Sequence, residues 1–190
     1  QERTVGPSLG KESIDKGKMS MIIGGILVII FMAFFYRLQG LVADLALVLN
    51  MLFIMGFLSA FGVTLTLPGI AGLVLTLGMA VDGNIIIFER IKEGIFKKKG
   101  LKQSVQEGFS VKGALSAIID ANITSLLTGI ILYVFGTGPI KGFAVVHVLG
   151  ILTSMFSAIL VSRALVNIIY GYRRKIDKLS IGQIYRPDKD

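Results

Sequence analysis

Five apolar runs, each about as long as a membrane is thick, constrain the fold of this chain more than any other feature. They lie at residues 19–36, 41–61, 68–88, 114–135 and 143–170. A helix needs about 20 predominantly apolar residues to cross the hydrocarbon core of a bilayer. The mean hydropathy of +0.76 and the 53% of hydrophobic residues exceed those of an ordinary soluble domain. The sequence therefore predicts an all-α membrane protein built as a bundle of five transmembrane helices.

The composition excludes several kinds of functional site. The chain has no cysteine and a single histidine, His147, so disulfides, thiol chemistry and a multi-histidine metal site are excluded. We find no phosphate loop and no nucleophile placed beside a base. We therefore expect a protein that is not an enzyme and that uses no cofactor and no metal. The isoelectric point near 9.8 does not indicate nucleic-acid binding, because the positive charge gathers at the ends of the apolar runs.

The distribution of lysine and arginine predicts the orientation of the chain in the membrane. Most basic residues follow the first, third and fifth runs: Arg37; Arg90, Lys92, Lys97, Lys98, Lys99, Lys102 and Lys112; Arg173, Arg174, Lys175, Lys178, Arg186 and Lys189. Fewer lie on the opposite side, namely Arg3, Lys11, Lys16, Lys18 and Lys141. The positive-inside rule then places the loop 89–113 and the tail 171–190 in the cytoplasm, and residues 1–18 outside.

An external N-terminus also predicts that the sequence is a fragment. Residues 1–18 are polar and do not resemble a cleavable signal peptide. We therefore expect them to be the end of a larger external region, which a further span would precede.

The third run carries one charged residue at membrane depth, Asp82. A carboxylate at that depth costs about 2.5 to 3.5 kcal/mol on insertion scales, so such residues are rare and usually functional. We interpret Asp82 as part of a proton or ion pathway. Small residues recur at Gly72, Thr76 and Ala80, which is a spacing that allows a neighbouring helix to approach closely.

The fourth run carries a stripe of polar residues. Ser116, Asp120, Thr124 and Thr128 recur every four residues and therefore share one face of a helix. Asn122 adds polarity nearby. A stripe of this kind is costly against lipid, so we expect it to face other helices or water. Two interpretations remain open, namely hydrogen bonding between helices and a role for Asp120 in the ion path.

Three charged residues are predicted to lie at one depth. With the orientation given above, Asp82, Asp120 and Arg163 all lie about 9 to 11 Å from the cytoplasmic ends of their runs, at 1.5 Å per residue. Opposite charges at one depth lower the burial cost of each other. The alternative for Arg163 is that its side chain reaches to the membrane surface.

Four segments of the sequence resemble one family. They read VGPSLGKESI at 5–14, GMAVDGNIIIFERIKE at 78–93, DANITSLL at 120–127 and FGTGPIKGFAV at 135–145. These segments resemble the SecD/SecF family of protein-export membrane subunits, of the resistance-nodulation-division superfamily. The resemblance covers nearly the whole chain. It implies the C-terminal transmembrane part of such a subunit, in which five spans follow a periplasmic domain.

The resemblance also implies a function, partners and site residues. Such subunits act with SecF and the SecYEG channel in the bacterial inner membrane, where they use the proton motive force to promote preprotein export. The family's transmembrane aspartate falls on Asp82, and its DxNxT pattern falls on Asp120, Asn122 and Thr124. The sequence departs from the pattern at Gly83, where alanine is expected. A preprotein would be held by the periplasmic domain, which this sequence does not include. The lipid bilayer is the other expected partner of the chain.

Two alternatives to this function stay open. One is a proton-coupled exporter of small solutes or lipids with the same superfamily fold. The other is a passive membrane scaffold that only binds partner subunits. A scaffold would tolerate the loss of the Asp82 carboxylate, whereas a proton-coupled subunit would not.

Overall fold

The computed structural model describes residues 7–170 and residue 181, and all the regular structure in this part of the chain is helical. The helices are α1 (Pro7–Tyr36), α2 (Leu38–Ala60), α3 (Leu67–Phe96), α4 (Leu101–Gly108), α5 (Ser116–Phe135), α6 (Pro139–Phe156) and α7 (Ser162–Tyr170). Two π-helical turns, η1 (Val111–Leu115) and η2 (Ser157–Val161), precede α5 and α7. The predicted cytoplasmic tail, 171–190, lies outside the described residues except for Ile181.

By length and composition, five helices of the described chain are able to cross a membrane. They are Gly10–Tyr36, Leu38–Ala60, Leu67–Phe96, Val111–Phe135 and Pro139–Ile169. The prediction of an all-α bundle of five membrane-length helices is therefore confirmed.

Two of these helices continue beyond their apolar runs. The first helix begins at Pro7, within the polar stretch, where Lys16 pairs with Glu12 across one turn at 2.8 Å. The third continues to Phe96, where Glu93 pairs with Lys97 at 2.5 Å. Ion pairs with this spacing support a helix on its exposed face. Apolar runs therefore locate the helices but underestimate their lengths.

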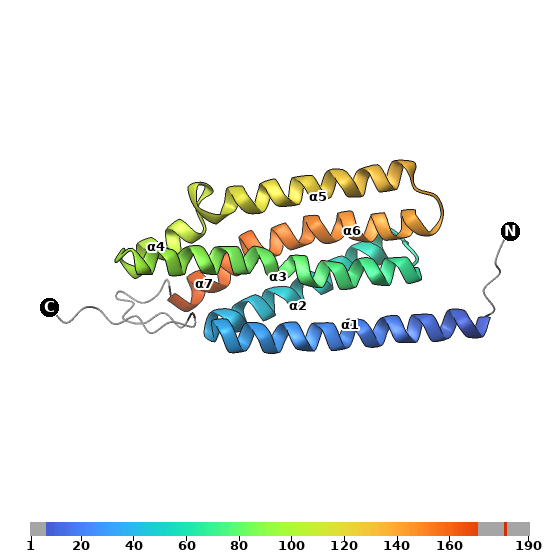
Figure 1. Ribbon diagram of the computed structural model, residues 1–190, viewed down its shortest axis with the longest axis horizontal. Helices are drawn as coiled ribbons and strands as arrows, with labels where there is room; N and C mark the ends of the chain where they lie inside the picture. Colours follow the sequence, from blue (N-terminus) through green and yellow to red (C-terminus); the bar gives the residue numbers. More distant parts are fainter. Residues whose placement is uncertain (1–6, 171–180, 182–190) are drawn as a thin grey trace.

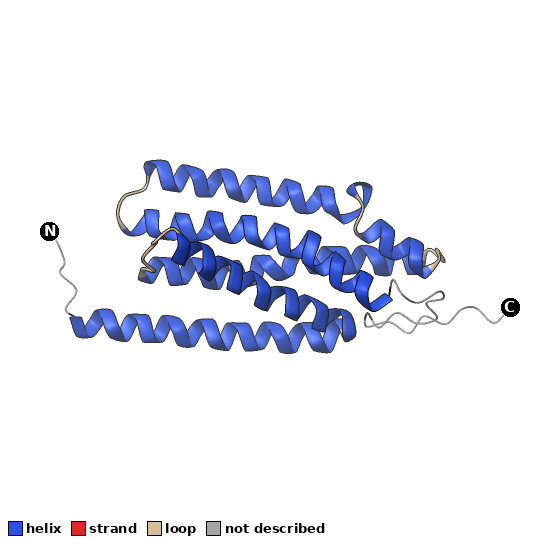
Figure 2. Ribbon diagram, turned by 180° about the vertical axis from the view of Figure 1, so that it is seen from behind, coloured by secondary structure: helices blue, strands red, loops and turns tan. Residues whose placement is uncertain are grey.

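The long helices lie side by side along one direction, with α3 in the middle of the bundle (Figures 1 and 2). Helix α3 packs against α1, α2, α4 and α6, whereas α5 packs mainly against α6. In both views α1 and α5 lie at opposite edges of the bundle. Within the described residues, one face of α3 and most of α5 are left uncovered.

Small residues bring α3 and α6 close together. A Cβ atom added to Gly72 would lie 3.3 Å from the side chain of Val146, and one added to Gly150 would overlap the side chain of Thr76. Thr76 is fully buried, and its hydroxyl donates to the carbonyl oxygen of Gly72 at 2.8 Å. The predicted close helix approach at Gly72 and Thr76 is confirmed, and its partner is α6.

The fifth apolar run is interrupted by the turn η2. There the hydroxyl of Ser157 donates a 2.7 Å hydrogen bond to the carbonyl oxygen of Ala46 in α2. Single π-helical turns inside α-helices are frequent at functional sites. This one joins α6 to α7 and fixes both against α2.

Candidate functional site

Asp82 lies on the face of α3 that no other helix of the described chain covers. Its neighbours Val81, Gly83 and Asn84 are buried, while its own side chain is exposed. Asp82 has no hydrogen bond or ion pair with any other residue that the structure describes. The carboxylate therefore points outward from the middle of a membrane-length helix.

The exposed face around Asp82 includes two small residues, Ala71 and Gly78. Ala71, Leu75, Gly78 and Asp82 are exposed and recur every three or four residues, so they form one stripe along α3. A Cβ atom added to Gly78 would meet nothing within 4 Å. We call Ala71, Leu75, Gly78 and Asp82 the free face of α3. Such a face allows another helix to approach closely.

Asn84 connects this region of α3 to the start of α7. The hydroxyl of Ser162 donates a 2.6 Å hydrogen bond to Oδ1 of Asn84, and both side chains are buried. Nδ2 of Asn84 donates to the carbonyl oxygen of Ala80 at 3.4 Å. Arg163 follows Ser162 directly, and its side chain is exposed. The bond therefore fixes Arg163 at the level of Asn84, which is half a turn from Asp82.

The glycine after Asp82 brings three helices to one level. A Cβ atom added to Gly83 would lie 3.0 Å from Cβ of Ala158 in η2 and 3.9 Å from Cγ2 of Ile118 in α5. Gly83 therefore leaves room for η2 at a tight contact. Ile118 lies half a turn from Asp120 in the same helix, so Asp120 and Asp82 are at similar heights in the bundle.

The polar stripe of α5 faces away from the rest of the chain. Ser116, Asp120, Thr124 and Thr128 are all exposed. The opposite side of α5 packs against α6, where a Cβ atom added to Gly129 would lie 2.7 Å from the side chain of Val148. The sequence thus predicts the shared face of these residues, which we expect to meet other helices or water, and no helix of the described residues covers it.

Two hydroxyls of the stripe, and the amide of Asn122 beside it, bond to the backbone of their own helix. The hydroxyl of Thr124 donates to the carbonyl oxygen of Asp120, and that of Thr128 donates to the carbonyl oxygen of Thr124, both at 3.1 Å. Asn122 is half-buried, and its Nδ2 donates to the carbonyl oxygen of Ile118 at 2.7 Å. The carboxylate of Asp120 has no such bond within the described residues, so it remains available to another group.

The three charged residues of the predicted site, Asp82, Asp120 and Arg163, therefore lie at similar levels in the bundle. Across the described part of the chain, no hydrogen bond or ion pair joins the side chains of Asp82, Asp120 and Arg163. All three side chains are exposed. Two carboxylates at similar levels are able to pass a proton to each other through water or other groups, and the guanidinium adds a fixed positive charge at that level.

Three buried polar residues of α2 lie outside the predicted site. Gln39, Asp44 and Asn50 are buried, and their side-chain nitrogen and oxygen atoms have no hydrogen-bond partner in the described structure. From the sequence we expect Asp44 near the membrane surface and Asn50 in a hydrogen bond between helices, and the structure shows neither. The bond between Asn84 and Ser162 was not predicted. Both residues are polar positions inside apolar runs, which is the feature that could have indicated the bond. The spacing of residues within one helix does not show which polar residues of two different helices meet.

The comparisons with known proteins agree with one another. Residues 1–171 match the family described as protein export membrane protein SecD/SecF, C-terminal. The protein translocase subunits SecD of Desulfurispirillum indicum and Rhodothermus marinus are 54% and 56% identical over 181 and 172 residues. These alignments cover 95% and 90% of this chain but only 35% and 27% of the two relatives.

Two solved structures have the same arrangement of helices. A crystal structure of SecDF from Thermus, described as a translocon-associated membrane protein, is 44% identical with a TM-score of 0.81. It matches 88% of this chain and 24% of its own chain. A second crystal structure of SecDF, in a super-membrane-facing form, has 44% identity and a TM-score of 0.80 over 90% of this chain and 23% of that one.

Proposed function

The chain belongs to the SecD/SecF family of protein-export membrane proteins over residues 1–171, and on this premise we propose that it forms membrane spans of a Sec translocase subunit driven by the proton motive force. It spans about a third or less of the relatives that it matches, with 35% of one and 27% of another. The named relatives are all translocase subunits, which favours preprotein export over the export of small solutes or lipids.

The exposed position of Asp82 in the middle of α3 carries this proposal. Its carboxylate lies on a membrane-length helix and forms no ion pair within the described chain. A charged carboxylate facing lipid costs about 2.5 to 3.5 kcal/mol. Such a carboxylate is usually covered by another protein surface or by water, and its change of charge is usually part of the protein's function.

Protonation of Asp82 is the proposed switch. The neutral acid fits against an apolar helix, whereas the ionised form requires water or a cation. One proton moving through a potential of 100 mV releases about 2.3 kcal/mol. This is close to the cost of the charged form at that depth, so each proton is able to shift α3 between two packings on its neighbour.

The surrounding polar residues have distinct proposed roles. Asp120 offers a second carboxylate at a similar level, and Arg163 offers the compensating positive charge. Asn122 and Thr124 hold the polar face of α5 through their bonds to the helix backbone. These residues would complete a proton path with groups contributed by a partner.

The expected partners are SecF and the SecYEG channel. The free face of α3 and the polar stripe of α5 are uncovered in the chain and are unsuited to lipid, so they support an interface with other membrane helices. SecF is the partner that would cover them. The preprotein itself would be held by a periplasmic domain outside this sequence.

The charge distribution supports one orientation in the bacterial inner membrane. The loop between α3 and α5, with its cluster of lysines, would face the cytoplasm. The ends of α1 and α6 at Pro7 and Pro139 would face the periplasm. Residues 1–18 would then border the periplasmic domain, and residues 19–170 would form the membrane bundle.

Replacing Asp82 by asparagine in the full-length subunit tests this function. We expect Asp82→Asn to abolish the part of preprotein export that depends on the proton motive force, because the amide keeps the size of the side chain but cannot titrate. The matched control is Asp15→Asn, since Asp15 is exposed in the polar start of α1. Export is measured as the rate of preprotein maturation in cells, with and without a protonophore.

Two results would contradict the proposal. If Asp82→Asn supports export at the normal rate and with the normal protonophore sensitivity, the subunit is a passive scaffold. If export fails equally in Asp82→Asn and Asp15→Asn while both proteins are present in the normal amount, the Asp82 carboxylate has no specific role. Immunoblotting of the membrane fraction measures that amount.

A further inference from the structure

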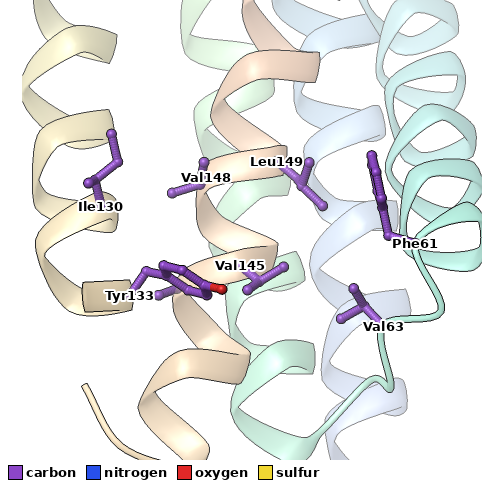
Figure 3. A pocket seen from close by; sticks show the side chains of 8 residues that line it. Phe61, Val63, Ile130, Tyr133, Val145, Val148 and Leu149 are labelled. Atoms are coloured by element: carbon purple, nitrogen blue, oxygen red, sulfur yellow. The ribbon is translucent and has the colours of Figure 1, made fainter. Parts of the chain in front are cut away.

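A continuous apolar groove lies on the surface of the bundle between α2, α5 and α6, and Figure 3 shows the hollow on its α5 side. It consists of two hollows of about 250 and 440 Å³, which share Phe61 and Leu149. Except for the hydroxyls of Tyr133 and Thr153, the side chains that line both hollows are apolar. The Thr153 hydroxyl donates to the carbonyl oxygen of Leu149 at 2.9 Å, so it presents no free polar group.

The groove has the length of one lipid leaflet. It follows α6 from Val145 to Phe156, which is about 16 Å at 1.5 Å per residue. The hydrocarbon core of a bilayer is about 30 Å thick, so one leaflet contributes about half of that. The groove therefore extends from one end of the membrane-spanning helices to near the middle of the bilayer.

The two hollows, of about 250 and 440 Å³, share lining residues, so together they form one elongated apolar space along α6. A single extended hydrocarbon chain fits this shape, and the aromatic rings of Phe53, Phe57 and Phe61 provide the wall along α2.

A basic residue and a tyrosine lie where the groove reaches the membrane surface. Lys141, Val145 and Leu149 recur every four residues, so Lys141 extends the same face of α6 that lines the groove. Nζ of Lys141 lies 5.7 Å from the centre of the Tyr133 ring. In Figure 3 that ring reaches from α5 toward α6, with its hydroxyl toward Val145. Tyrosine and lysine at the end of a span mark the headgroup level.

The charge at this end of the groove is unbalanced. Lys141 is the only charged residue between Asp120 and Arg163 in the sequence, and the segment from 45 to 81, which includes the loop between α2 and α3, has none. Within the described residues, Lys141 forms no ion pair. The mouth of the groove therefore offers one ammonium and one phenolic hydroxyl to an anion at the level of the lipid phosphates.

We infer that this groove binds one acyl chain of an anionic phospholipid, whose phosphate is held by Lys141 and the hydroxyl of Tyr133. The apolar walls select a hydrocarbon chain, the length matches one leaflet, and the charge at the mouth selects the headgroup. A lipid in this position joins α2, α5 and α6, and it fills the space beside α5, which has few other contacts within the chain.

Fluorescence quenching tests this site, because the chain has no tryptophan. Phe57→Trp places a reporter in the groove, and Ile26→Trp places one on the exposed side of α1, away from it. Each variant is reconstituted in phosphatidylcholine vesicles that contain increasing amounts of brominated phosphatidylglycerol. We expect phosphatidylglycerol to be preferred about fivefold over phosphatidylcholine at Phe57→Trp, as for one basic residue acting on an anionic headgroup. At Ile26→Trp we expect no preference.

Adding Lys141→Gln to Phe57→Trp should remove the preference, and Lys141→Arg should keep it. Native mass spectrometry of the Lys141→Gln chain provides a second measurement, in which retained phosphatidylglycerol should fall by the same factor. Equal preference at the two reporters, or a preference unchanged by Lys141→Gln, would overturn the inference. Weak quenching at Phe57→Trp by both lipids would overturn it as well, because it would show that protein covers the groove.

Discussion

The hydroxyl of Ser162 donates a 2.6 Å hydrogen bond to Oδ1 of Asn84, which joins α7 to α3 inside the bundle. Asn84 is 1% exposed and Ser162 is fully buried, so no water competes for this bond. Ser162 also donates to the carbonyl oxygen of Ser157 at 3.3 Å, in the π-helical turn. Ser162 therefore connects α3, which carries Asp82, to the turn η2 and to α7, which carries Arg163.

We predict a measurable coupling between Asn84 and Ser162. Hydrogen bonds between side chains in membrane proteins contribute about 0.6 kcal/mol on average and up to about 1.7 kcal/mol. Because this bond is short and buried, a double-mutant cycle with Asn84→Ala and Ser162→Ala should give a coupling energy in the upper half of that range. Unfolding by sodium dodecyl sulfate in mixed micelles, followed by circular dichroism, measures the free energy of unfolding of each variant.

Thr124→Val is a suitable control for this cycle. Its hydroxyl is exposed and bonds only to the backbone of its own helix at 3.1 Å. We expect Thr124→Val combined with Asn84→Ala to be additive, since the two sites share no contact. If Asn84 and Ser162 are additive as well, the bond contributes nothing to the coupling of α3 and α7.

Two glycines, one in a tight helix contact and one in open space, should respond differently to replacement by alanine. A Cβ atom at Gly150 would overlap the side chain of the fully buried Thr76, whereas one at Gly78 would meet nothing within 4 Å. Gly150→Ala should therefore destabilise the chain by about 1 to 3 kcal/mol through overpacking. Gly78→Ala should stabilise it by up to about 1 kcal/mol, because alanine favours the helix. The same unfolding measurement compares them, and equal effects would contradict the α3–α6 packing described here.

The segment between α3 and α5 should have a pH-dependent stability. Lys99 bonds to both carboxylate oxygens of Glu107, at 2.8 and 2.7 Å. These bonds hold the pKa of Glu107 below its ordinary value of 4.5. A lowered pKa in the folded state means that the stabilisation is present above the ordinary pKa and is lost as the pH falls through the folded value.

Hydrogen exchange of the α4 amides measures this effect. After correction for intrinsic rates, protection of Leu101–Gly108 should be constant from pH 7 to pH 5 and should fall at lower pH. Glu107→Gln should remove the acid-dependent loss and give low protection throughout. A wild-type profile that stays flat below pH 4 would show that the ion pair does not hold this segment.

The sequence predicts the helices well because hydrophobic length depends on local composition. It does not predict the turn at Ser157, since that turn is held by the hydroxyl's bond to Ala46 in a helix far away in the sequence. Likewise, the four-residue spacing of Ser116, Asp120 and Thr124 predicts one shared face, but only packing shows that this face points outward. The direction of Asp82 depends on its neighbours in the same way, because burial of Gly83 and Asn84 against other helices leaves Asp82 exposed.

The free face of α3 is predicted to be the surface that binds the partner subunit. Gly78 lies on this face, and Gly56 lies on the exposed side of α2; both have open space around them. We expect Gly78→Leu to keep the stability of the chain but to weaken its association with SecF. The added side chain prevents close helix approach, and overpacking of about 1 to 3 kcal/mol corresponds to roughly 5- to 150-fold weaker binding.

Co-purification of the full-length subunit with tagged SecF from solubilised membranes measures this association, and Gly56→Leu is the matched control. Both substitutions add the same side chain to an exposed glycine inside a membrane-length helix. Loss of SecF only with Gly78→Leu is the expected result, because Gly78 shares its face with Asp82. If both variants keep SecF, another surface binds it, and Asp82 must face lipid or water instead of a partner helix. If both lose it, the effect comes from insertion of a bulky residue and not from the free face.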